Sequence, residues 1–267
     1  MRVSCIQMDN RLGLTQADVD ANFAHAKEMI RKTIEAEHPD VVCLPETWNV
    51  GFFPKGDFSA LCDDDGKRVK EEIGSLAKEY HTNIVAGSVG NLRDGKICNT
   101  AFVFDREGRC VYSYDKIHGF SPSGEPEVFQ GGKSYDTFQL DGVNCGLIIC
   151  YDIRFPELTR SITLKGVDVF FVVSQWPAIR TAHLDSLSQA RAIENQMFLA
   201  LTNSVATAYG TTCGGSSALI DPWGVRLAHA GDQEEVITAD FDLSIVKGIR
   251  EGINVFRDRQ PELYNIG

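Results

Sequence analysis

The chain has 267 residues and a formal net charge of −11, with 43% hydrophobic and 24% charged residues. These proportions are typical of a globular protein, and the negative charge argues against a general affinity for nucleic acid or anionic membranes. No run approaches the roughly 18 consecutive apolar residues of a membrane span, and the polar start lacks the apolar core of a signal peptide. We therefore expect a cytoplasmic protein.

Strand-length apolar runs alternate with helical patterns in the first half of the chain. Strands are predicted at residues 3–8, 41–44, 84–89 and 100–104. Apolar residues spaced by three or four positions predict helices between residues 19 and 34, with Thr15 as N-cap, and between residues 69 and 80. A hairpin turn is predicted at residues 105–108.

The second half repeats this alternation. Strands are predicted at residues 143–150, 167–174, 198–203, 217–220 and 236–241, with turns at 141–142 and 221–224. Helices are predicted at residues 155–165, ended by Gly166, and at residues 181–196. The pattern indicates an α/β fold with mixed sheets, and its many strands favour two stacked sheets with helices outside. Without a linker or a break in composition, we expect one domain over residues 1–267.

The cysteines and histidines suggest neither a disulfide framework nor a metal site. Eight cysteines occur without a CxxC pair, and six histidines are scattered along the chain. We expect seven of the eight thiols to act only as small buried apolar residues. No metal and no cofactor are expected.

Two strand-like segments end in a charged residue. Residues 41–44 run into Pro45, which must end the strand, and Glu46 follows. Glu46 is either a solvated loop residue or a general base. The alternating run at residues 111–115 ends before Lys116, which either forms a surface salt bridge or stabilises negative charge in a pocket.

A third segment ends in a thiol. The apolar strand at residues 143–150 ends at Cys150, and a helix is predicted to begin near Pro156. This strand–turn–helix arrangement places a side chain beside backbone N–H groups, which lower a thiol pKa and favour the nucleophilic thiolate. Cys145, in the middle of the same strand, is expected to be a core residue.

Together these segments resemble the nitrilase, or carbon–nitrogen hydrolase, superfamily. The matching stretches are LPE at 44–46, YDKIH at 114–118, CYDIRFPE at 150–157, SQWPAIR at 174–180, QARAIENQ at 189–196 and DRQPELY at 258–264. The resemblance implies a four-layer α-β-β-α sandwich and assembly into a homodimer or a larger homo-oligomer. It also implies a catalytic triad of Glu46, Lys116 and Cys150.

The roles of these residues follow from the resemblance. Glu46 takes the thiol proton, Cys150 attacks an amide carbon, and the oxyanion is held by Lys116 and the backbone N–H of Tyr151. Many members add a second glutamate that positions the substrate. Its spacing to Gly132 favours Glu127, with Glu125 as the alternative and an exposed loop acid as the structural interpretation.

The segments around Cys150 and Trp176 are similar to the omega-amidase branch, whose members hydrolyse 2-oxo diacid monoamides such as 2-oxoglutaramate. Trp176 is expected near the pocket. Arg154 is expected to form a salt bridge with Glu157, with a substrate carboxylate as the alternative partner. Family members commonly carry Leu where this chain has Gly119, and the Gly/Ser/Pro-rich loop at residues 120–124 that follows is expected to be mobile.

Other functions remain open at this point. A second enzymatic possibility is an N-carbamoyl-amine or other aliphatic amidase, also with a small-molecule amide as substrate. A different class is a catalytically silent binding protein on the same fold, which should lack one of the triad residues. All three are present.

Overall fold

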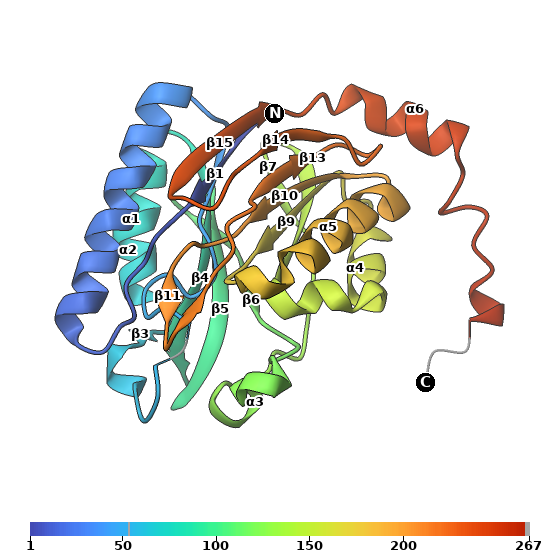
Figure 1. Ribbon diagram of the computed structural model, residues 1–267. Coiled ribbons are helices and arrows are strands. Elements are labelled where there is room, and N and C mark those ends of the chain that lie inside the picture. Colours follow the sequence, from blue (N-terminus) through green and yellow to red (C-terminus); the bar gives the residue numbers. More distant parts are fainter. Residues whose placement is uncertain (53, 265–267) are drawn as a thin grey trace.

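In the computed structural model, which describes residues 1–52 and 54–264, two β-sheets lie face to face and helices cover their outer faces (Figure 1). Helices α1 (Gln16–Glu37) and α2 (Lys67–Glu79) pack on one sheet, whereas α4 (Pro156–Thr163) and α5 (Thr181–Asn195) pack on the other. This confirms the predicted four-layer α-β-β-α architecture. The predicted domain also includes residues 265–267, which lie outside the described residues.

The first sheet mixes parallel and antiparallel strands. Its order is β15 (Glu235–Asp240), β1 (Arg2–Gln7), β2 (Val41–Cys43), β4 (Asn83–Arg93), β5 (Lys96–Phe104) and β6 (Cys110–Asp115), with β3 (Asp63–Asp64) paired to β4. Strands β1, β2 and β4 are parallel, and β5 is antiparallel to both β4 and β6. Consequently β2, β4 and β6 run in the same direction.

The second sheet has a parallel centre and antiparallel edges. Its order is β14 (Arg226–His229), β13 (Ala218–Ile220), β10 (Phe198–Thr202), β9 (Val169–Val173), β8 (Val143–Ile149) and β7 (Phe138–Leu140). Strands β8, β9 and β10 are parallel. A separate hairpin is formed by β11 (Thr207–Ala208) and β12 (Thr211–Thr212).

Burial on both faces explains the continuous apolar runs in the central strands. All five residues of β9 are buried, because one face meets the other sheet and the opposite face meets helices. A second apolar cluster, which includes Phe23, Trp48 and Ile73, fills the space between the first sheet and α1 and α2. The sandwich therefore has a core on each side of the first sheet.

Helices α1, α2, α4 and α5 were predicted from the sequence. Thr15 caps α1 in a capping box with Asp18, as predicted. Helices α3 (Glu125–Val128) and α6 (Ser244–Gly252) were not predicted. The first is a single turn, too short for a periodic pattern, whereas the second carries an amphipathic pattern, with Val246 and Ile249 buried, that was not recognised. No helix within the described part of the chain is long and apolar enough to cross a bilayer.

Candidate active site

Glu46 lies just beyond β2, where the two sheets meet. Backbone N–H of Glu46 donates to Ser174 O at 3.4 Å, and the N–H of Gln175 donates to Glu46 Oε2 at 2.8 Å. The Gln175 side chain also donates to Glu46 O at 2.7 Å. Gly87 allows this chain path, because a Cβ there would lie 1.9 Å from Pro45 O. The carboxylate is thus fixed by residues at the end of β9 in the other sheet.

Lys116 follows β6, and its side chain extends to Glu46. Its N–H donates to Asn99 O at 2.9 Å, its carbonyl accepts from the N–H of Gly132 at 2.9 Å, and its Nζ donates to Glu46 Oε1 at 2.8 Å. The side chain is only 3% exposed. Because β2 and β6 run in the same direction, both residues lie at carboxyl ends of strands, where α/β folds commonly place their sites.

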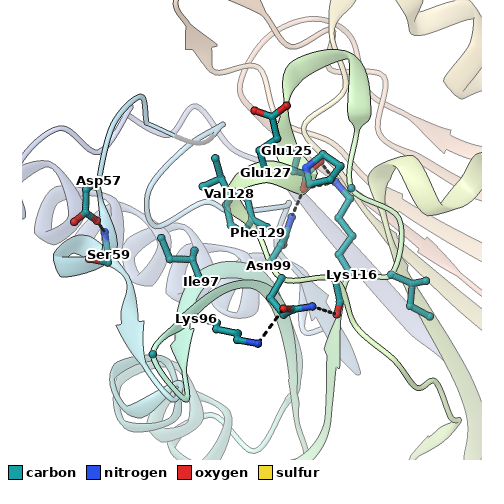
Figure 2. Close-up of a pocket in the computed structure, with 16 residues that line it drawn as sticks. Asp57, Ser59, Lys96, Ile97, Asn99, Lys116, Glu125, Glu127, Val128 and Phe129 are labelled. Carbon is teal, nitrogen blue, oxygen red and sulfur yellow. Dashed lines mark hydrogen bonds and ion pairs between the residues drawn. The ribbon is translucent and has the colours of Figure 1, made fainter.

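A second glutamate and an asparagine complete this cluster. Lys116 Nζ lies 2.8 and 2.9 Å from the two carboxylate oxygens of Glu125, and Phe120 N–H donates to Glu125 Oε2 at 2.7 Å. The side-chain amide of Asn99 donates to Glu46 Oε1 at 2.8 Å and to Glu125 Oε1 at 3.5 Å. Figure 2 shows Asn99 and Lys116 beside this glutamate. Asn99 was not singled out from the sequence, although a polar residue within an apolar strand is a usable signal.

The structure places Glu125, rather than the expected Glu127, in contact with Lys116, and the substrate-positioning role of either glutamate stays a prediction. Glu125 begins the single turn of α3 directly after Gly124, whose φ is +78°, and its side chain is buried. Glu127 is exposed, and it lines a cavity of about 600 Å³ that Glu125, Lys116 and Asn99 line as well (Figure 2). Residues two positions apart on a helical turn point to different sides, so only one of them can meet the lysine.

Cys150 sits in a strained turn between β8 and α4, and its side chain is buried at 6% exposure. The turn is a 3₁₀ segment, Cys150–Arg154, and Cys150 itself has a φ of +48°. A positive φ is costly for a residue with a Cβ, and reactive residues on such turns are presented at the edge of a sheet. The predicted strand–turn–helix arrangement is therefore present.

The electrostatic setting of Cys150 differs from the prediction. Burial, followed by the charge of Glu46, raises the pKa of the Cys150 thiol well above its ordinary value, while Lys116 and Ser174 act in the opposite direction. The expected lowering of this pKa is therefore wrong. The resting group is a protonated thiol beside a carboxylate, an arrangement that needs a base to remove the proton.

Lys116 remains an ammonium in this cluster. Burial by itself lowers the pKa of Lys116, but the negative charges of Glu46 and Glu125 outweigh it, and the pKa lies well above its ordinary value. A buried charge is tolerated only when it is paired and hydrogen-bonded, and this one has two carboxylate partners. The site thus holds a fixed positive charge beside the thiol.

A pocket of about 220 Å³ opens in front of Cys150. Tyr151, Trp176 and Arg154 line it, together with Lys116 and Arg180. Trp176 is 3% exposed and held by two hydrogen bonds, from its N–H to Asn203 Oδ1 at 2.7 Å and from Nε1 to Arg180 O at 2.8 Å. Tyr151 and Trp176 therefore both line this pocket, and their roles in binding substrate or the oxyanion stay predictions.

Two arginines of this pocket have no carboxylate partner among the described residues. The Arg154 guanidinium lies over the Trp176 ring at 4.7 Å and contacts His183 Nδ1 at 3.2 Å, so the expected salt bridge to Glu157 is not formed. Arg180 lies over the Phe120 ring at 5.1 Å. No aspartate or glutamate is among the described residues that line this pocket. The pocket is therefore suited to an anionic group.

The loop after Lys116 packs tightly on α3. A Cβ at Gly119 would lie 3.0 Å from Pro126 Cγ, so the small residue permits this close approach. Ser123 Oγ donates to Phe120 O at 2.9 Å within the following 3₁₀ turn. These contacts bring Phe120 to the pocket and its N–H to Glu125.

The remaining cysteines only partly match their expected role. All eight thiols are free, and Cys145 is fully buried as predicted. Cys62 is half-buried and Cys110 is exposed, so the expectation of seven buried thiols is wrong for these two. Within residues 1–52 and 54–264, no group of three or more His, Cys, Asp or Glu side chains is arranged to hold a metal ion.

Comparison with known proteins identifies sequence relatives over nearly the whole length. Residues 2–251 match the family model described as carbon-nitrogen hydrolase. The 2-oxoglutaramate amidase of Bacillus subtilis (strain 168) is 37% identical over 262 residues, which cover 98% of both chains. The hydrolase in agr operon of Staphylococcus aureus is 37% identical over 259 residues, covering 95% of this chain and 97% of the relative. Omega-amidase NIT2 of Homo sapiens is 29% identical over 96% of this chain and 97% of its own.

Solved structures share the fold. A CN-hydrolase superfamily protein from Xanthomonas campestris, determined with an arsenic adduct in its active site, has a TM-score of 0.89 and 25% identity, covering 100% of this chain and 99% of its own. A carbon-nitrogen hydrolase from Helicobacter pylori G27 has the same TM-score of 0.89 at 21% identity, and the match covers 99% of this chain and 97% of that protein. At this identity the likeness supports the fold alone.

Proposed function

Since this chain belongs to the carbon–nitrogen hydrolase family and is one of its amidases, we propose that it releases ammonia from the terminal amide of small anionic monoamides. The best-fitting substrates are 2-oxo diacid monoamides such as 2-oxoglutaramate, the substrate named for the Bacillus subtilis relative. Cys150 is the proposed nucleophile, Glu46 the proton shuttle, and Lys116 the fixed positive charge.

The first half-reaction forms a thioester. Glu46 accepts the Cys150 proton as Sγ attacks the amide carbon, and the carbonyl oxygen becomes an oxyanion beside Lys116 Nζ and the N–H of Tyr151. When the oxyanion collapses, the C–N bond breaks and Glu46 returns its proton to the leaving nitrogen, which departs as ammonia. The protonated thiol beside Glu46 supports this order of events.

The second half-reaction regenerates the thiol. Glu46 removes a proton from water, the hydroxyl oxygen attacks the thioester carbon, and the same donors hold the second oxyanion. The C–S bond then breaks, a carboxylic acid forms, and the Glu46 proton returns to Sγ. Glu125 and Asn99 contact the charged groups throughout, so their proposed role is to keep Glu46 and Lys116 in place.

The observation that carries the substrate class is a pair of arginines, Arg154 and Arg180, that have no carboxylate partner among the described residues, in a pocket for which the described lining has no acidic side chain. A guanidinium binds a carboxylate through two parallel hydrogen bonds, and a 2-oxo group adds another acceptor. Glutamine would instead bring an ammonium group close to two cations, and no acid is among the described residues that line the pocket. The pocket thus favours a 2-oxo acid amide over its 2-amino counterpart.

A substrate panel tests this proposal directly. Ammonia release is measured with 2-oxoglutaramate, glutamine, a neutral aliphatic amide and an N-carbamoyl amine, and carbon dioxide is measured with the last. We expect the highest kcat/KM for 2-oxoglutaramate. An equal or higher value for the neutral amide would exclude the anionic substrate class, and carbon dioxide release at a higher kcat/KM would identify a carbamoyl amidase instead.

A further inference from the structure

Asp152 lies two residues after Cys150, is fully buried, and has no role in the proton transfers described above. Its two carboxylate oxygens accept four hydrogen bonds. Oδ1 accepts from His118 N–H at 2.9 Å and lies 2.8 Å from His118 Nδ1, and Oδ2 accepts from Tyr114 Oη at 2.7 Å and from Ile149 N–H at 3.1 Å. An ionised carboxylate has about four acceptor positions, so all of them are used.

The partners of Asp152 surround the reactive residues on both sheets. Tyr114 and His118 lie two residues before and two residues after Lys116, whereas Ile149 directly precedes Cys150. One carboxylate therefore joins two segments: the lysine segment at residues 114–118, which continues from the first sheet, and the turn Cys150–Arg154, which follows β8 of the second sheet. The positive φ of Cys150 requires such support, because an unfavourable backbone conformation persists only when its surroundings hold it.

The chemistry of these partners keeps them as donors. Burial and the adjacent Asp152 charge raise the pKa of Tyr114 well above its ordinary value, so its hydroxyl stays protonated. The His118 ring is stacked on Phe155 at 3.6 Å with an interplanar angle of 10°, which fixes the direction of Nδ1. Among the described residues, no lysine or arginine pairs with Asp152, and His118 is its one basic partner.

We propose that Asp152, through Tyr114 and His118, is a positioning group that sets the distance and orientation between Cys150 and Lys116. The inference rests on the proposed roles of those two residues. None of the three positioning side chains lines the substrate pocket, so they act on the catalytic step rather than on substrate binding. Misplacement of reacting groups by about 1 Å lowers a rate by about 100-fold.

Two tyrosines of β6 provide a matched test. Tyr114→Phe removes a hydroxyl that binds Asp152, whereas Tyr112→Phe removes one that donates to Asp136 O at 3.0 Å, away from the site. We expect Tyr114→Phe to lower kcat by about tenfold with KM unchanged, and Tyr112→Phe to leave both constants within about twofold of the parent enzyme. Equal effects of the two variants would overturn the positioning role.

Histidine variants provide a rescue test. His118→Asn keeps a side-chain donor near the place of Nδ1, whereas His118→Ala removes it, so kcat should recover in the first variant relative to the second. Thermal unfolding is recorded in parallel, because a purely structural role would lower Tm without separating the two variants in kcat. Similar kcat values for the Asn and Ala variants would contradict the proposal.

The last measurement separates this inference from the proposed function. The rate of Cys150 alkylation by iodoacetamide, followed by mass spectrometry of the peptide that contains it, should fall in Asp152→Asn together with kcat. Cys150→Ala is the reference variant. Full activity in that variant would contradict the assignment of Cys150 as the nucleophile. If kcat is unchanged in Asp152→Asn while Cys150→Ala is inactive, the positioning role of Asp152 is contradicted and the proposed function is not.

Discussion

Lys116 and Glu125 form a doubly hydrogen-bonded ion pair, with the lysine Nζ at 2.8 and 2.9 Å from the two carboxylate oxygens. Both side chains are almost completely buried, and the same Nζ also contacts Glu46. A buried ammonium between two carboxylates keeps its charge and its position. The pair therefore gives the site a fixed positive group without help from solvent.

The ion pair predicts different effects for two neighbouring glutamates. Glu125→Gln should lower kcat by about 100-fold, because Lys116 loses one of the two carboxylates that hold it, and misplacement of a reacting group by about 1 Å has effects of about that size. Glu127→Gln should leave kcat within about twofold of the parent, since Glu127 is exposed. Steady-state ammonia release measures both. A larger loss in the Glu127 variant would reverse the assignment of the second glutamate.

Gly132 controls the backbone of the lysine segment. Its N–H donates to Lys116 O at 2.9 Å, and a Cβ at this position would lie 2.1 Å from Asp115 O. Gly132→Ala should lower the free energy of unfolding by about 1–3 kcal/mol and reduce kcat, because the overlap displaces the segment that carries Lys116.

Gly248→Ala is the matched control. Gly248 lies in α6, and a Cβ there would meet no atom within 4 Å. Alanine at this position should raise the free energy of unfolding by up to about 1 kcal/mol and leave kcat unchanged. Denaturant unfolding and ammonia release measure both variants. Unchanged activity in Gly132→Ala would show that the contact with Lys116 is dispensable.

Arg154 is expected to determine affinity for the anionic end of the substrate. Hydrogen bonds to charged groups contribute about 1.5–3 kcal/mol, so Arg154→Ala should raise KM for 2-oxoglutaramate by about 10- to 100-fold. KM for a neutral aliphatic amide should change little. Arg109→Ala is the control, because Arg109 is exposed and pairs with Asp105 far from the pocket. A parallel rise in KM for both substrates would exclude charge recognition.

The charge of Glu46 should be visible in the pH dependence of Cys150. Burial and Glu46 raise the pKa of this thiol, whereas Lys116 lowers it. In Glu46→Gln the raising charge is absent and the lysine remains, so the thiolate should form at a lower pH than in the parent. Iodoacetamide alkylation followed at the Cys150 peptide measures the midpoint, with exposed Cys110 as internal control. A midpoint that stays or moves upward would contradict this electrostatic account.

The sequence predicts the layers of the fold because their signals are local. Thr15 and the periodic residues after it define α1, and continuous apolar runs identify central strands that are covered on both faces. Glu46 and Cys150 were singled out because each follows an apolar strand, and their catalytic roles stay predictions. The two-residue strands were missed, since elements so short depend on their neighbours rather than on their own periodicity, whereas α6 carries an amphipathic pattern that was not recognised.

The parts of the site that were missed depend on contacts between distant segments. Asn99 reaches Glu46 across 53 positions, and Asp152 reaches Tyr114 across 38. The choice between Glu125 and Glu127 depended on where a one-turn helix begins, which the spacing to Gly132 does not reveal. The raised pKa of Cys150 likewise comes from burial and from Glu46, more than a hundred residues earlier in the chain.

The nucleophile assignment is tested most directly by comparing two cysteines of one strand segment. Cys145 is buried within β8, and Cys150 directly follows that strand. Ammonia release from 2-oxoglutaramate is measured for Cys150→Ala and Cys145→Ala, with circular dichroism to establish that both are folded. Loss of activity to background in Cys150→Ala, with activity retained in Cys145→Ala, is the predicted result. Turnover retained by folded Cys150→Ala would contradict the account.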